Sequence, residues 1–222
     1  MKQIFSGTVF EILPLSNGVM FSYIKEQMGT EMELGYKMLT FDGRFEDVTN
    51  WAYWITKFGN NYKSIVPLCE NYIKAKTLML PNGRVFLMDS TGASQIVDTD
   101  AVIPWSGELT YRGNAPSSIA LYKHSLWATY KQENVLMKYN VDTLREELRL
   151  GGKNSPFNQP NDIFLEGENA IISNSGSNTL LQLNLNSYSL FEVEKFDEPV
   201  YQYVKVDEYK FVLLRSGLYL MG

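Results

Sequence analysis

Cys69 and His124 are the residues in this chain whose types could support nucleophilic chemistry, and each is the only one of its kind among 222 residues. A cysteine nucleophile needs a base such as histidine within hydrogen-bonding reach, and a Ser-His-Asp set would need the same histidine. His124 stands in "LYKHSLW", at a predicted turn between two strands, with no other metal-ligating or acidic residue close in sequence. We therefore interpret His124 as a turn residue and Cys69 as a small, buried apolar residue.

Two polar segments have sequences that are also found in catalytic or phosphate-binding loops. "DSTG" at 89–92 is similar to the motif of aspartic proteases, but that chemistry needs two carboxylates that share a proton, and the chain has no second copy. "SNSGSN" at 173–178 is flexible and polar but lacks the lysine and the spacing of a phosphate-binding loop. Both segments fall at the end of an apolar stretch, so we interpret them as turns between strands.

Short apolar stretches recur along the chain between Gly, Asn, Asp and Ser residues, which is the pattern of strands and turns. Val19, Val85, Leu126, Ala170 and Phe211 mark equivalent positions in five of these stretches, at spacings of 66, 41, 44 and 41 residues. Each mark lies in the second of four predicted strands. A four-stranded unit of about 40 to 45 residues is typical of a β-propeller blade, because stacking such sheets around an axis buries both of their faces.

The two ends of the chain predict how the ring closes. The last unit stops after its third strand, in "LYLMG" at 218–222, and the chain begins with a spare strand, "MKQIF" at 1–5. If the first strand completes the last blade, no blade edge at the closure is left unpaired. We therefore expect an all-β, five-bladed β-propeller of four-stranded antiparallel blades, in one domain over residues 1–222. A compact two-domain α+β protein is the competing architecture.

One blade also resembles a known group of propellers. "QPNDIFLEGENAIISNSGSNTLLQLNL" at 159–185 is similar to blades of the NHL, YncE and gluconolactonase (SMP-30) group, with Pro160, Asn161, Asp162 and Gly167 at the matching positions. The segment "APSSIALYKHSLWATYK" at 115–131 keeps the proline and both strands but not the Asn-Asp pair. The resemblance implies the propeller fold.

The same resemblance implies a metal site as an alternative. In gluconolactonase-like enzymes a Glu, Asn and Asp set from different blades holds a divalent metal in the central channel, and oxygen ligands of this kind suit Ca²⁺ or Mg²⁺. Asn161 is the position that carries over, with Glu11 and Asp207 as further candidates. The other interpretation of Asn161 and Asp162 is turn capping, in which their side chains bind nearby backbone amides.

The expected blade starts argue against this alternative, since they include a single carboxylate. These positions are Glu11, Tyr72, Ser117, Asn161 and Tyr201. We therefore expect no cofactor, and Ca²⁺ or Mg²⁺ only if the protein is a metal-dependent, gluconolactonase-like hydrolase.

The long first spacing contains an insertion after the first blade, at about residues 46–70, with the aromatic sequence "NWAYWITKFGNNYKSIVPL". It is predicted to form a short helix or an extra pair of strands. Exposed aromatic side chains at this density mark interaction surfaces, whereas buried ones would cap or plug the propeller. The predicted partner-binding residues are Trp51, Tyr53, Trp54, Phe58, Tyr62 and Trp105.

Composition limits the classes of partner. The net charge is −5 and the pI about 5.0, and no predicted strand face gathers Lys and Arg, which argues against nucleic-acid binding. No apolar run is long enough to cross a membrane, and the alternating N-terminus does not read as a signal peptide, so we expect the mature protein to start near Met1. A single cysteine suits a reducing compartment such as the cytoplasm.

The absence of an acid/base set in the sequence favours a non-catalytic binding or assembly module that docks a protein partner or forms a homo-oligomer. The many Asn, Lys, Tyr and Ile residues are typical of an AT-rich genome, such as that of a low-GC bacterium or its phage. A phage virion or tail component is therefore a specific form of this prediction.

Overall fold

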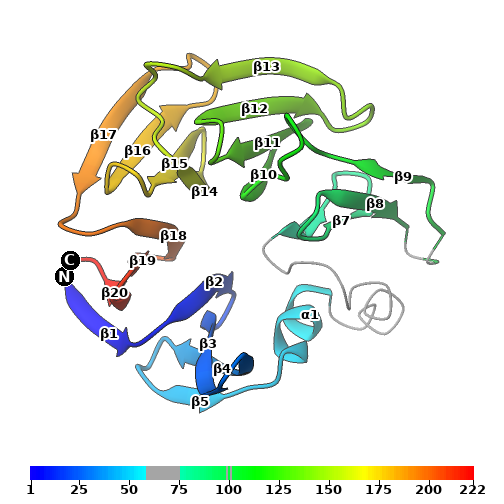
Figure 1. Ribbon diagram of the computed structural model, residues 1–222. Coiled ribbons are helices and arrows are strands. Elements are labelled where there is room, and N and C mark those ends of the chain that lie inside the picture. The colour runs from blue at the N-terminus through cyan, green and yellow to red at the C-terminus, as the bar shows by residue number, and fades with distance from the viewer. Residues whose placement is uncertain (59–75, 99, 101) are drawn as a thin grey trace.

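The strands of the protein form five four-stranded sheets arranged in a ring (Figure 1). This computed structural model describes residues 1–222 except 59–75, 99 and 101. All pairings between neighbouring strands are antiparallel in the described residues. The protein is a five-bladed β-propeller, as the repeat spacing predicts.

Each blade is built from strands that are close in sequence, and the strands follow one another from the channel outwards. Blade one contains β2 (Val9–Leu15), β3 (Gly18–Met28), β4 (Glu31–Thr40) and β5 (Phe45–Asp47). Blade two contains β6 (Leu78–Met79), β7 (Val85–Met88), β8 (Ala93–Val97) and β9 (Trp105–Glu108). Blade three contains β10 (Ser118–Tyr122), β11 (Ser125–Tyr130), β12 (Val135–Asn140) and β13 (Glu146–Gly151). Blade four contains β14 (Pro160–Glu166), β15 (Asn169–Asn174), β16 (Thr179–Asn184) and β17 (Leu190–Lys195).

Blade five joins the two ends of the chain, as predicted. It contains β18 (Val200–Val206), β19 (Tyr209–Leu214) and β20 (Gly217–Leu220), and β1 (Lys2–Ser6) pairs with β20 as its outer strand. The two strands approach so closely that a Cβ on Gly217 would lie 2.2 Å from the carbonyl oxygen of Phe5, and Gly217 has a φ of +142°. Glycine is therefore required at this point of the closure.

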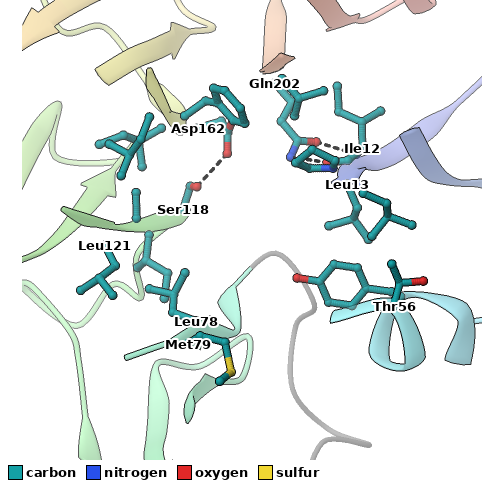
Figure 2. Close-up of a pocket in the computed structure, with 18 of the residues that line it drawn as sticks. Ile12, Leu13, Thr56, Leu78, Met79, Ser118, Leu121, Asp162 and Gln202 are labelled. Atoms are coloured by element: carbon teal, nitrogen blue, oxygen red, sulfur yellow. Dashed lines mark hydrogen bonds between the residues drawn. The ribbon is translucent and has the colours of Figure 1, made fainter. Parts of the chain in front are cut away.

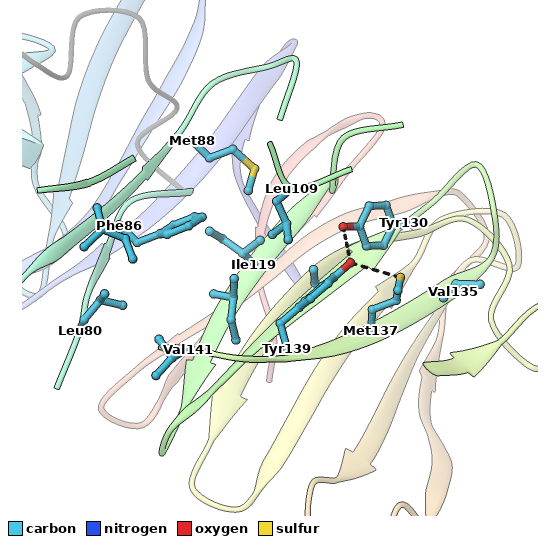
Figure 3. Close-up of a cluster of buried hydrophobic side chains, with 13 residues drawn as sticks. Leu80, Phe86, Met88, Leu109, Ile119, Tyr130, Val135, Met137, Tyr139 and Val141 are labelled. Carbon is cyan, nitrogen blue, oxygen red and sulfur yellow. Dashed lines mark hydrogen bonds between the residues drawn. The ribbon is translucent and has the colours of Figure 1, made fainter. Parts of the chain in front are cut away.

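Apolar clusters fill the spaces between neighbouring blades. Side chains alternate along each strand, so Ala170 and Ile172 of β15 face blade three while Ile171 faces blade five. Figure 3 shows the cluster between blades two and three, in which the buried hydroxyls of Tyr130 and Tyr139 are hydrogen-bonded at 2.8 Å. Each sheet buries both faces against its neighbours, so a single blade depends on the blades beside it for its stability.

The aromatic insertion contributes a helix, α1 (Trp51–Phe58), which lies between blades one and two (Figure 1). Tyr53 and Trp54 pack in one apolar cluster with Met20 of blade one and Leu87 of blade two. The helix thus joins two blades that would otherwise be separated. Tyr62, Cys69 and the rest of the insertion up to residue 75 lie outside the described residues.

Blade one carries a hairpin that extends beyond its sheet. β3 has 11 residues and β4 has 10, but β2 pairs with β3 only as far as Tyr23, and β5 pairs with Lys37 to Leu39 of β4. Residues 24–34 therefore project past the blade, and we call them the blade-one hairpin. Its tip is the turn that corresponds to the β7–β8 and β11–β12 turns of the next blades. No helix of the described residues is long and apolar enough to cross a membrane.

Candidate functional site

The inner strands surround a central channel that contains a cavity of about 500 Å³ (Figure 2). Much of its wall is apolar, including Ile12, Leu13, Leu121, Ile163, Leu165 and Val204. Polar groups come from Ser118 of blade three, Asp162 of blade four and Gln202 of blade five. An apolar cavity with a few convergent polar groups is the usual form of a ligand site.

The polar groups of the channel hold neighbouring blades together. Ser118 Oγ donates a hydrogen bond of 2.7 Å to Asp162 Oδ1 across blades three and four. Gln202 accepts the backbone N–H of Ile12 through Oε1 at 2.7 Å and donates to the Ile12 carbonyl through Nε2 at 2.9 Å. Figure 2 shows both contacts. Side chains near the start of the inner strands therefore join blade three to blade four and blade five to blade one.

Asp162 is a buried carboxyl group in this network, with 7% of its surface exposed. Burial raises its pKa to about 6, and hydrogen bonds from the Ser118 hydroxyl and from the backbone N–H groups of Tyr203 and Ile163 limit the rise. The ordinary pKa of this group is 3.8. The folded protein therefore holds the proton between about pH 4 and pH 6, where the unfolded chain has lost it.

The exchange Asp162→Asn tests this carboxyl group. Because the folded state binds the extra proton, Asp162 makes the protein less stable as the pH rises from 4 to 7, by about 3 kcal/mol for a shift of this size. Asparagine is neutral throughout and keeps an acceptor for Ser118. We expect the difference in unfolding free energy between the native protein and the variant to fall by this amount over the same range in urea titrations. Parallel pH curves would contradict the assignment, since the other carboxyl groups cancel in the difference.

The candidate metal ligands do not form a common site. Asn161 Nδ2 donates a hydrogen bond of 2.7 Å to the carbonyl of Tyr201 in blade five, so its amide joins blades rather than capping its own turn. Glu11 is half-buried near the start of β2. Asp207 is exposed in the turn after β18, at the opposite end of a seven-residue inner strand, which is about 20 Å long at 3.3 Å per residue. Within the described residues, no three His, Cys, Asp or Glu side chains are grouped closely enough to hold a metal ion.

The predicted partner-binding aromatics differ in exposure. Tyr53 and Trp54 are buried in α1 with their rings edge to face at 5.2 Å, whereas 37% of Trp51 is exposed. Trp105 is half-buried in β9 and packs against the cluster between blades two and three. Phe58 is the last residue of α1. The insertion is thus in part a structural wedge between blades, and Trp51 is a surface aromatic.

The motifs interpreted as turns are placed as predicted. His124 is exposed in the turn between β10 and β11. The segment 89–92 forms the turn between β7 and β8, where Asp89 Oδ1 accepts the backbone N–H groups of Thr91 and Ala93 at 2.8 and 3.1 Å. The segment 173–178 leads from β15 into β16.

The blade-one hairpin is a surface that was not predicted. Met28, Met32 and Leu34 are exposed by 68%, 53% and 40%. Met32 and Leu34 lie on the same face of β4 as Tyr36 and Met38, which pack against the cluster around α1. The apolar core face of blade one therefore continues past the blade into solvent.

The other face of the hairpin carries three glutamates, together with Met28, which is paired with Glu31. Glu26 is paired across the strands with Glu33, and Lys25 Nζ lies 2.6 Å from Glu33 Oε1. Glu31 lies on the same face as Glu33, two residues away along β4. The hairpin is thus amphipathic, although it projects past the blade and both of its faces meet solvent. The alternation "EMEL" at 31–34 was the sequence signal for it.

The fold and the channel define a β-propeller, and the comparisons with known proteins agree on this level only. No family model matches the chain, and no curated protein sequence matches it. The structure is similar to Sqt1 from Saccharomyces cerevisiae, with a TM-score of 0.53 and 11% identity over 96% of this chain and 71% of that one. A streptogramin B lyase gives a TM-score of 0.52 and 12% identity over 96% of this chain and 65% of that chain.

A third similar structure is a catalytically inactive virginiamycin B lyase from Staphylococcus aureus with quinupristin. Its TM-score is 0.50 and its identity 16%, over 96% of this chain and 69% of that one. This chain therefore spans about two thirds of the length of these proteins. At such identities the likeness concerns the fold, which is compatible with a scaffold or binding module and is also used by enzymes.

Proposed function

We propose that the protein is a non-catalytic assembly module that docks a protein partner on the blade-one hairpin. The observation that carries this proposal is the apolar face of Met32 and Leu34, which leaves the sheet and meets solvent. Single exposed apolar residues are ordinary, but a face that continues a core surface marks an interaction site. Trp51 and Ile55 are exposed as well, by 37% and 45%, on one side of α1.

The partner that fits this surface is a second copy of the chain. Two hairpins with their apolar faces in contact would bury Met32 and Leu34 of both copies around a two-fold axis. Glu26, Glu31 and Glu33 would then point away from the contact and stay hydrated. An anionic partner such as a nucleic acid is disfavoured, because it would meet these carboxylates at the hairpin and a chain of net charge −5.

The hairpin edges support the same proposal. In the described residues, no strand pairs with Lys25 to Met28 on the β2 side or with Glu31 to Gly35 on the β5 side. Long unpaired edges of this kind are normally covered by a neighbouring chain or protected by charge.

A phage virion or tail component would be a larger assembly of the same type, and its test is mass spectrometry of purified particles.

A matched pair of double variants tests the docking surface. Met32→Ser with Leu34→Ser removes the apolar face, while Glu31→Ser with Glu33→Ser alters the same strand on its opposite face. We expect light scattering after size exclusion to give twice the chain mass of 25.4 kDa for the native protein and for the glutamate pair, and the monomer mass for the apolar pair. A native protein that stays monomeric at concentrations up to about 100 μM would overturn the proposal, because its dimer would then be weaker than most specific complexes.

A further inference from the structure

A second cavity, of about 530 Å³, lies at the mouth of the channel, where the inner strands of blades three and four begin. Lys76 reaches it from just before β6 of blade two, and Lys131 from the turn between β11 and β12 of blade three. The remaining wall carries neutral polar side chains: Ser90, Thr91, Asn114, Ser117, Gln132 and Asn161. This cavity is therefore polar and carries two lysines, unlike the apolar channel below it.

Lys76 is buried without a partner of opposite charge in the described part of the chain. It is 6% exposed, its Nζ donates to the backbone carbonyl of Pro116, and no ion pair among the described residues includes it or Lys131. Burial lowers the pKa of Lys76 to about 8; attraction by Asp89 raises it, and repulsion by Lys131 lowers it further. Lys76 is still mostly charged at pH 7, and a buried charge of this kind is costly unless it is paired.

Joining the blades does not explain why this residue is a lysine. Ser117 Oγ donates to the Pro160 carbonyl at 2.9 Å, and Asn161 Nδ2 donates to the Tyr201 carbonyl at 2.7 Å. Lys76 makes the corresponding contact from blade two to blade three. Blades three and four thus make the same kind of joint with short neutral side chains, which avoid the cost of burying a charge.

We infer that the cavity at the channel mouth binds a small oxyanion, whose carboxylate or phosphate group lies between Lys76 and Lys131. The anion supplies the missing opposite charge, and ammonium groups that are partly removed from water bind oxyanions strongly. The carboxylate of Asp89, which attracts Lys76, is engaged by the N–H groups of its own turn. The two lysines thus form a local positive site in a protein whose net charge is −5. The inference is independent of the hairpin proposal.

Isothermal titration of the native protein with citrate and with inorganic phosphate, at constant ionic strength, tests the site. We expect saturable binding of at least one of the two anions, and the better ligand shows whether the site prefers carboxylate or phosphate. Lys131→Gln should weaken binding by about tenfold, the effect of losing one charged contact of about 1.4 kcal/mol. Lys76→Met should weaken it at least as much.

Lys123→Gln is the matched control, because Lys123 is exposed in the β10–β11 turn at the opposite end of the channel. It should bind the anion as the native protein does. Lys131 is half-buried and outside the strands, so its variant keeps the test valid if Lys76→Met does not fold. Absence of saturable binding of either anion would overturn the inference, and so would an equal loss of affinity in Lys131→Gln and Lys123→Gln.

Discussion

Deletion of residues 1–6 is expected to abolish the cooperative unfolding transition of the protein and to cause aggregation. β1 is the outer strand of blade five and pairs with β20 from Lys2 opposite Leu220 to Ser6 opposite Gly217. It also contributes to the contact with blade one, where the ring of Phe5 lies 5.1 Å from the rings of Phe21 and Tyr23. Loss of this strand opens the ring at one seam and exposes an unpaired edge of β20.

Rescue by relocation makes this prediction specific. The termini lie side by side (Figure 1), so the six residues can be attached behind Gly222 through a short linker and pair with β20 as a hairpin. We expect the relocated strand to restore a cooperative thermal transition by circular dichroism, because the same hydrogen bonds and the same Phe5 contacts form. A truncated protein that melts like the full chain would show that the ring does not depend on this closure.

The second large effect is expected for Trp54→Ala, which should lower the free energy of unfolding by about 3 to 5 kcal/mol. Trp54 is 3% exposed and packs between blade one and blade two, so the exchange leaves a cavity in the wedge that joins them. Trp51→Ala on the same helix is the control, and a clearly smaller loss is expected there because Trp51 is 37% exposed, against 3% for Trp54. Urea titration measures both, and equal losses would contradict the buried wedge.

The fold was predictable because four of the five blades are local in the chain. A period near 42 residues and the alternation within each strand depend on neighbours in sequence, and the spare strand at 1–5 matched the missing strand after 218–222. The helix of the insertion was one of two predicted forms. Which of its aromatic side chains are buried depends on how α1 is rotated about its axis relative to blades one and two. In this orientation Trp54 is buried and Trp51 is partly exposed to solvent.

The site was harder to predict because its contacts join different blades. Asn161 was identified through its resemblance to a metal-binding position, but its amide is bonded to Tyr201, 40 residues away in the next blade. Lys76 likewise acquires its role from blade three, and nothing adjacent in sequence indicates burial.

The blade-one hairpin was missed for a related reason. The segment "QMGTEMELG" at 27–35 is polar and contains two glycines, so it is not one of the apolar stretches that mark the predicted strands. The strands continue to Met28 and from Glu31, held by pairing across the hairpin that includes the Lys25–Glu33 ion pair. Strand length past the sheet edge therefore depends on cross-strand contacts rather than on local propensity.

The most direct test of the docking proposal is amide hydrogen exchange of the native protein, measured by mass spectrometry at several protein concentrations. The account predicts that exchange in residues 24–34 slows as the concentration rises, because a second copy covers the hairpin, while the outer strand β17 exchanges at the same rate throughout. Exchange of the hairpin that is fast and independent of concentration would show that no second copy docks there.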